Sequence, residues 1–148
     1  MKLLRKKEVK ELNEQIKQLF NLDDFFDKKG RVGIEDNIVI YNEEAVFFYH
    51  KKKLVPTLKL LLKNNFLPKV TVDMGAIKFV ASGADVMRPG IVETETFEKD
   101  DFIVVIDQNH KKPLAVCVAK LSSIDINESK NGNMLKSIHY IGDNIYQI

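Results

Sequence analysis

The residue types that most often carry catalysis or bind metals are sparse in this chain of 148 residues. Its three histidines, His50, His110 and His139, stand far apart, and none has a second ligand type at the spacing of a metal motif. The one cysteine, Cys117, lies in an apolar run, where a thiol is buried and unreactive. No Gly-x-Ser-x-Gly elbow and no Gly-x-x-x-x-Gly-Lys-Ser/Thr phosphate loop is present. We therefore expect no enzymatic activity, no metal site and no cofactor.

Three adjacent lysines, Lys51, Lys52 and Lys53, form a run of positive charge. Adjacent ammonium groups can contact the phosphates of a nucleic acid and release its counterions. The same run also suits a solvated loop, so both interpretations stay open. The net charge of the chain is only +2, and residues 67–148 hold 9 basic and 11 acidic residues. Any surface that binds anions must therefore be made locally by a few placed cations.

Composition places the chain among ordinary globular proteins. Hydrophobic residues make up 45% and charged residues 30%, which excludes a disordered or collagen-like chain. A single cysteine excludes an internal disulfide framework and suits a reducing compartment. No apolar run approaches the roughly 18 residues that a membrane-spanning helix needs. We expect a cytoplasmic protein that does not contact membranes.

The elements of the first half are a helix, a small antiparallel sheet and a second helix. Apolar residues at steps of three and four predict an amphipathic helix over residues 2–20, which packs on a sheet or binds a partner. Polar turns separate three predicted strands, at residues 31–35, 37–41 and 45–49. Pro56 is expected to open the second helix, which Asn64, Asn65 and Pro68 end. We place a domain boundary there, between residues 1–67 and 68–148.

The sequence of the second half predicts many short strands and one short helix. Asp73 is expected to cap a helix through Ser82, and Gly83 to end it in a left-handed conformation. Residues 102–107 and 114–120 are nearly continuous apolar runs and are expected to be central strands. The other elements predicted after residue 120 are a helical turn at residues 124–126 and strands at residues 137–141 and 144–148. This pattern is typical of a closed or nearly closed barrel, so the fold class is α+β.

Residues 70–91 carry the clearest motif, Val-Thr-Val-Asp-Met-Gly-Ala-Ile-Lys-Phe-Val-Ala-Ser-Gly-Ala-Asp-Val-Met-Arg-Pro-Gly-Ile. This segment resembles the signature of the PUA domain, which is named after pseudouridine synthase and archaeosine transglycosylase. The resemblance continues to the His-Tyr-Ile-Gly-Asp segment at residues 139–143 and covers roughly residues 69–147. The layout of the whole chain also resembles the malignant-T-cell-amplified-sequence proteins and their archaeal relatives. It implies an N-terminal helix–meander–helix domain followed by a PUA-type pseudo-barrel.

PUA domains bind structured RNA with the short helix and the glycine-rich block after it, so the resemblance implies an RNA site here. Small residues in this block let backbone amides approach a phosphate or sugar. Arg88 can place two donors on a phosphate, and Lys78 should project from the helix toward the same side. The glycines could instead serve only as turn residues, and Met87 could lie in the core. Both interpretations stay open. The residues expected to bind RNA are Lys78, Gly83, Ala84, Met87, Arg88, Pro89 and Gly90, with Lys51, Lys52 and Lys53 as a second group.

The resemblance implies a non-catalytic RNA-binding factor of the translation apparatus. Such a factor would bind the tRNA acceptor end or small-subunit rRNA, and would act in initiation, re-initiation or recycling. Its expected partners are tRNA or rRNA, the small ribosomal subunit and an initiation-factor-like protein, but not DNA. Two alternatives stay open. One is an accessory RNA-binding subunit of a tRNA or rRNA modification enzyme, of the pseudouridine synthase or archaeosine transglycosylase type. The other is a protein-interaction adaptor.

Overall fold

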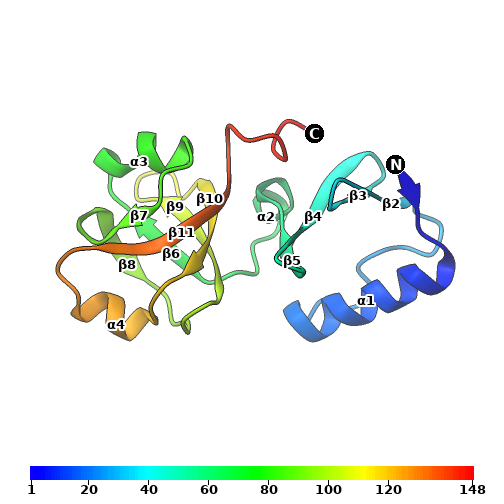
Figure 1. Ribbon diagram of the computed structural model, residues 1–148, viewed down its shortest axis with the longest axis horizontal. Coiled ribbons are helices and arrows are strands. Elements are labelled where there is room, and N and C mark those ends of the chain that lie inside the picture. The colour runs from blue at the N-terminus through cyan, green and yellow to red at the C-terminus, as the bar shows by residue number, and fades with distance from the viewer. The chain divides into compact units, whose positions relative to one another are not determined.

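The computed structural model describes the whole chain, Met1–Ile148. The chain divides into two compact units, Met1–Pro56 and Thr57–Ile148 (Figure 1). Each unit has its own sheet, and all the hydrogen-bonded strand pairs lie within one of the two sheets. No helix is long and apolar enough to cross a membrane.

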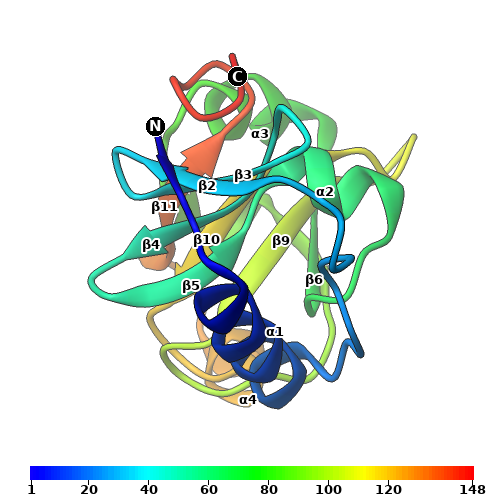
Figure 2. The same ribbon diagram turned by 90° about the vertical axis from the view of Figure 1, so that its right-hand side faces the viewer.

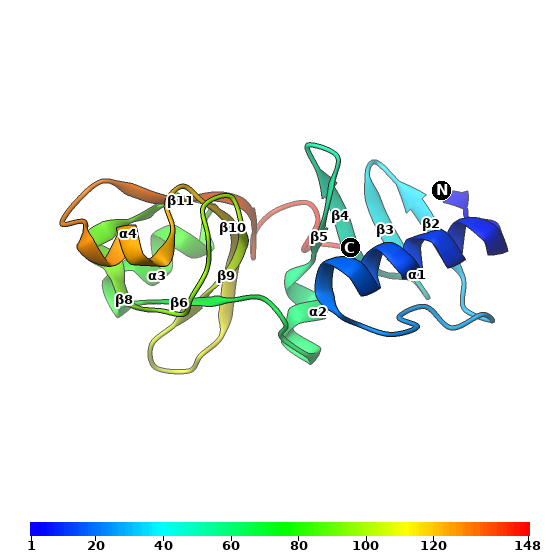
Figure 3. The same cartoon turned by 90° about the horizontal axis from the view of Figure 1, so that it is seen from below.

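The first unit is a helix on a five-stranded antiparallel sheet. The helix is α1 (Lys6–Phe20), which buries Leu12 and Ile16 and stacks the ring of Phe20 on Phe47, with 5.9 Å between centroids. Figures 2 and 3 show α1 running alongside the sheet. The strands, in their order across the sheet, are β1 (Lys2–Leu3), β2 (Val32–Glu35), β3 (Ile38–Tyr41), β4 (Glu44–His50) and β5 (Lys53–Pro56). The three predicted strands of this half are confirmed.

The predicted starts of both helices in this half are wrong. The first helix begins at Lys6 rather than at residue 2, because Lys2 and Leu3 pair with β2. Pro56 does not open a helix: it ends β5, opposite Phe47. A proline is tolerated there because β5 is an edge strand. The helix that follows begins one residue after Thr57, whose side chain accepts a hydrogen bond from the Leu60 amide at 3.2 Å.

The second unit is a six-stranded, nearly closed barrel with three short helices. Its sheet order is β7-β11-β10-β9-β6-β8, and only the pair of β6 and β9 is parallel. The strands are β6 (Lys69–Val72), β7 (Val86–Met87), β8 (Ile91–Thr94), β9 (Phe102–Asp107), β10 (Pro113–Ala119) and β11 (Asn133–Tyr140). The helices are α2 (Leu58–Lys63), α3 (Met74–Ala81) and α4 (Ser123–Glu128). Figure 1 shows α3 and α4 at opposite ends of the barrel. The α+β class with a PUA-type pseudo-barrel is confirmed.

The core of the barrel lies on β9 and β10, the two central strands. Residues 103–106 and 114–117 are all buried, as the apolar runs predicted. Ile126 of α4 and Val80 of α3 are buried in the same core. The barrel therefore fixes one face of α3 and leaves the other face to solvent.

The prediction of a last strand at residues 144–148 is wrong. The segment is a series of turns, and the Asp143 carboxylate accepts hydrogen bonds from the amides of Tyr140 and Tyr146 at 3.0 and 2.9 Å. A short acidic side chain that bonds the neighbouring backbone offers the chain an alternative to a strand ladder. This carboxylate thus turns the chain out of β11.

The domain boundary predicted at residue 67 stays a prediction. The compact units meet earlier, between Pro56 and Thr57, so that α2 packs with the second unit rather than with the first. Leu58 and Leu61 of α2 are buried, whereas Leu62 is 48% exposed.

Candidate RNA interface

Helix α3 is held by a cap at its start and by the turn that follows it. The Asp73 carboxylate accepts a hydrogen bond from the Ala76 amide at 3.0 Å, as the sequence predicted. The Asp73 amide donates in turn to the Gly90 carbonyl at 2.9 Å, which ties the helix start to the Arg-Pro-Gly segment. A side chain at Gly90 would bring its Cβ to 3.0 Å from Cβ of Ala76. The small residue at position 90 thus serves this close packing.

The solvent face of α3 combines a cation with apolar side chains. Val80 is buried, and Ala76 and Ile77 pack against the core. Phe79 lies about 200° around the helix from Ile77 and is 64% exposed. Lys78 is also exposed, about 100° around the helix from Phe79, and Met74 lies one turn before Lys78. An exposed aromatic ring and an exposed ammonium group on one helix face suit a ligand that has both flat rings and negative charges.

The turn after α3 is left-handed, as predicted. Gly83 has φ of 100°, and the Ala84 amide donates to the Phe79 carbonyl at 3.0 Å. A Cβ at position 83 would lie 2.7 Å from Cε1 of Tyr140. Gly83 therefore lets the turn approach the tyrosine ring on β11, and this approach sets the position of the exposed residue Ala84.

The Arg88 side chain makes two hydrogen bonds within the protein that the sequence did not predict. Its Nε donates to the Ser129 carbonyl at 2.9 Å, and its Nη1 donates to the Ile91 carbonyl at 3.2 Å. Both acceptors are backbone groups, one of them 41 residues away. The Arg88 guanidinium therefore stabilises the fold through these two hydrogen bonds. Nη2 makes no hydrogen bond within the protein, so that contact of Arg88 with a phosphate stays a prediction.

The structure thus gathers the predicted residues of the second unit around α3, β7 and the short 3-10 turn at Arg88–Gly90. The amide of Arg88 donates to the Gly132 carbonyl at 2.8 Å, which anchors this turn to the start of β11. Met87 is 50% exposed rather than part of the core. We call the exposed set the α3 surface; it comprises Met74, Lys78, Phe79, Ala84, Met87 and Pro89. Lys51, Lys52 and Lys53 belong to the first unit and are exposed.

Sequence reasoning missed Phe79 and Met74. Neither residue is among those that the sequence predicts to bind RNA. The helical period places Phe79 opposite Ile77, and the packing of Ile77 and Val80 on the barrel decides which of the two faces is exposed.

His139 is a structural group and not part of the surface. Its side chain is 0% exposed. Nε2 accepts a hydrogen bond from the Leu58 amide at 3.0 Å, and Nδ1 lies 2.7 Å from the Asp143 carboxylate. Because Nε2 is the acceptor, Nδ1 carries the proton that Asp143 accepts. Burial lowers the pKa of His139, against the opposing effect of Asp143. This neutral imidazole pins the start of α2 to the barrel.

Cys117 and Asp107 are two further titratable groups held within the barrel. Burial raises the pKa of the Cys117 thiol, which disfavours the nucleophilic thiolate. The Asp107 carboxylate is occupied by the amides of Asn109, His110 and Lys112, and these hydrogen bonds lower its pKa. No group of three or more His, Cys, Asp or Glu side chains is placed to hold a metal ion.

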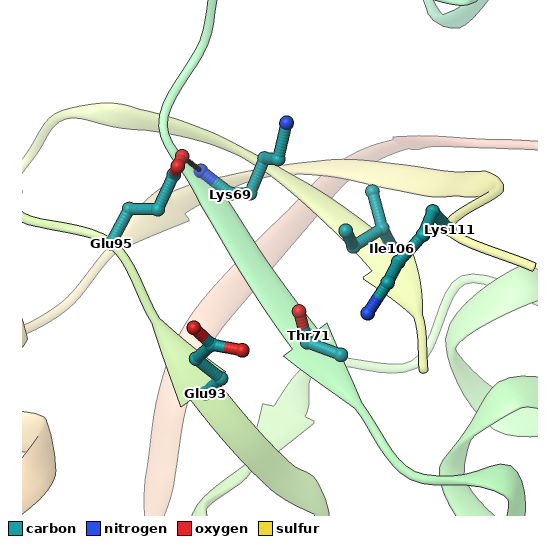
Figure 4. Close-up of a pocket in the computed structure, with 6 residues that line it drawn as sticks. All are labelled: Lys69, Thr71, Glu93, Glu95, Ile106 and Lys111. Atoms are coloured by element: carbon teal, nitrogen blue, oxygen red, sulfur yellow. Dashed lines mark hydrogen bonds between the residues drawn. The ribbon is translucent and has the colours of Figure 1, made fainter. Parts of the chain in front are cut away.

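A shallow pocket lies on the outer face of β6, β8 and β9 (Figure 4). Thr71 stands between Glu93 and Ile106 in the sheet register. Glu95 accepts a hydrogen bond from the Lys69 amide at 2.7 Å, which Figure 4 marks. Two lysines and two glutamates line the pocket, so it carries no net charge that would attract an anion.

Comparison with known proteins identifies the family. The model of the PUA domain matches residues 68–141. An uncharacterized protein of Methanocaldococcus jannaschii is 41% identical and covers 97% of this chain and 93% of its own. Translation machinery-associated protein 20 of Schizosaccharomyces pombe is 32% identical over 85% of this chain and 76% of its own.

Malignant T-cell-amplified sequence 1 of Danio rerio is 33% identical over 92% of this chain and 83% of its own. Among solved structures, a hypothetical protein of Pyrococcus horikoshii superposes with a TM-score of 0.79 at 29% identity and covers 98% of this chain and 96% of its own. The matched segment and these long alignments agree with the barrel and with the motif at residues 70–91. The chain belongs to the PUA-domain family that contains translation machinery-associated protein 20 and the malignant T-cell-amplified sequence proteins.

Proposed function

We propose that this protein is a non-catalytic RNA-binding factor that acts with the translation apparatus in the cytoplasm, and that the α3 surface contacts the RNA. The observation that carries the proposal is that Phe79 exposes its ring and Lys78 exposes its ammonium group on the solvent face of the same helix. RNA is recognised largely at unpaired ends and loops, where bases stack on aromatic side chains and phosphates meet cations. The α3 surface offers both groups from one rigid helix.

Within this proposal the RNA is the tRNA acceptor end or small-subunit rRNA, and the step is initiation, re-initiation or recycling. Relatives that are named for the translation machinery support this choice. The small ribosomal subunit and an initiation-factor-like protein are the partners we propose. Gly83, Arg88 and Gly90 would shape the surface, while Ala84, Met87 and Pro89 would contact a ribose or base.

Fluorescence anisotropy of labelled tRNA, with and without its 3′ CCA end, tests the proposal. Lys78→Ala should lower the slope of log affinity against log salt by about one, because one phosphate contact is lost. Phe79→Ala should weaken binding about 5- to 150-fold with an unchanged slope, which is the range for the loss of one stacked base. Lys99→Ala, which removes an exposed cation elsewhere in the same unit, is the matched control and should change neither quantity.

Wild-type affinity and slope in both variants would exclude the α3 surface as the interface. Binding that depends on the CCA end would favour the acceptor end of tRNA over rRNA. Sedimentation with small ribosomal subunits would support the translation role. Co-purification with a pseudouridine synthase or a transglycosylase, without ribosomal subunits, would favour the accessory-subunit alternative. Absence of any RNA binding at physiological salt would favour the protein adaptor.

A further inference from the structure

The first unit carries a cationic hairpin whose conformation is unusual for its residues. Strands β4 and β5 are joined by a two-residue turn, with His50 and Lys53 as the last pair and Lys51 and Lys52 between them. Lys51 has φ of 49° and Lys52 has φ of 68°. Positive φ at both central residues is the type I′ geometry, for which Asn-Gly is preferred. A lysine there has an unfavourable contact between its Cβ and the backbone.

The other two hairpins of the same sheet use residues that tolerate this conformation. Asp36-Asn37 joins β2 to β3 with φ of 50° and 65°, and Asn42-Glu43 joins β3 to β4 with φ of 49° and 73°. Asp and Asn adopt left-handed backbone more readily than other non-glycine residues. Only the turn between β4 and β5 has neither Asp, Asn nor Gly at its centre. Folding alone does not favour lysine at these two positions.

The charge of the hairpin is not neutralised within the protein. Lys51, Lys52 and Lys53 are exposed, and none of them makes an ion pair. Burial lowers the pKa of the neighbouring His50, and the charges of Lys51 and Lys53 lower it further. Asp36, in the turn at the same end of the sheet, forms no ion pair with the lysines. The tip therefore presents three uncompensated positive charges.

We propose that the tip of this hairpin, Lys51-Lys52-Lys53, binds the phosphate backbone of double-helical RNA without reading its sequence. Ammonium groups are compact point charges that suit phosphates. Binding of single strands relies on exposed aromatic platforms, and the tip has none, because Tyr49 and His50 are half-buried. Contact with phosphates positions a protein on a duplex and carries no base specificity. This site is separate from the α3 surface and does not require that surface to bind RNA.

The double variant Lys51→Asn/Lys52→Gly separates function from folding. It installs the preferred residues of the turn, so that its melting temperature should equal or exceed that of the wild type. It also removes two cations. The probe is a blunt 20-base-pair RNA duplex of arbitrary sequence, titrated by anisotropy at several salt concentrations. We expect weaker binding and a salt slope lower by about two.

Two further variants make the test discriminating. Lys28→Gln/Lys29→Gln removes an adjacent exposed pair from a loop of the same unit and is the matched control, which should keep the wild-type slope. Lys51→Gln/Lys52→Gln/Lys53→Gln should lower the slope by about three. The proposal is overturned by a wild-type slope in the hairpin variants, by an equal loss in the control pair, or by absence of duplex binding in the wild type. Phe79→Ala should leave duplex binding unchanged, so that failure of the α3 surface and failure of the hairpin give different results.

Discussion

Replacement of Gly83 by alanine tests the geometry on which the α3 surface depends. Gly83 has φ of 100°, and an added Cβ would lie 2.7 Å from Cε1 and 2.8 Å from Cζ of Tyr140. Real Cβ atoms essentially never approach another heavy atom within 3.0 Å, so that either the turn or the ring must move. Gly75→Ala is the matched control on the same helix, because its nearest contact would be an ordinary 3.5 Å from the Asp73 carboxylate.

The expected cost has two sources. A non-glycine residue with strained positive φ costs about 1–3 kcal/mol. Overpacking of a methyl group against a packed ring costs about 1–3 kcal/mol. The free energy of unfolding of Gly83→Ala should therefore fall by about 2–6 kcal/mol, which is a loss of about 4–24 °C in melting temperature at about 2–4 °C per kcal/mol. Gly75→Ala should be neutral or more stable by up to about 1 kcal/mol, since alanine favours a helix.

Thermal unfolding followed by circular dichroism, with calorimetry as a second probe, measures both variants. A double-mutant cycle with Tyr140→Ala isolates the steric part, because truncation of the ring removes the clash and leaves the backbone strain. The two single losses should then sum to more than the loss in the double variant. A Gly83→Ala protein as stable as the wild type, or strictly additive losses in the cycle, would refute the close approach of the turn to Tyr140.

Three other predictions concern Arg88, His139 and Cys117. Arg88→Ala should lower the free energy of unfolding by about 1–3 kcal/mol, because it leaves the carbonyls of Ser129 and Ile91 without their donor; an unchanged melting temperature in thermal unfolding would contradict this role. Since the pKa of His139 is lower in the folded state than its ordinary value of 6.5, the unfolded state binds the proton first as pH falls. The contribution of the neutral His139 to the free energy of unfolding should be complete above about pH 6.5. Below that pH the free energy of unfolding should fall by up to about 1.4 kcal/mol per pH unit. Urea unfolding from pH 7 to 5 measures this slope, which His139→Gln should reduce; an identical slope in that variant would exclude His139 as its source. Cys117 should resist a thiol reagent at pH 8 in the folded protein and react fully in denaturant, and rapid labelling of the folded protein would show that the thiol is not buried.

Features that depend on neighbouring residues were predictable from the sequence. The cap at Asp73, the left-handed Gly83 and the hairpin turns at residues 36–37 and 42–43 each depend on adjacent residues that hydrogen-bond the local backbone or tolerate a positive φ. The apolar runs of β9 and β10 predicted the centre of the barrel, because a strand covered on both faces must be apolar throughout. The motif at residues 70–91 is likewise local, and it pointed to the family before the fold was known.

Only the tertiary structure decided which partners the polar side chains bond and which side chains are exposed to solvent. Arg88 donates to the Ser129 carbonyl, 41 residues away, and His139 accepts from the Leu58 amide, 81 residues away. No pattern within a short stretch of sequence predicts either hydrogen bond. Pro56 lies in a strand because that strand is at the edge of the sheet, and residues 144–148 form turns where the Asp143 carboxylate accepts the Tyr146 amide. A short sequence window carries the preferences of its own backbone, whereas the assignment of a donor or a ring to core, partner or solvent depends on which distant segments fold against it. For this protein, the sequence determined the barrel and its capped helix, and the packing of that helix on the barrel decided that Phe79 faces solvent.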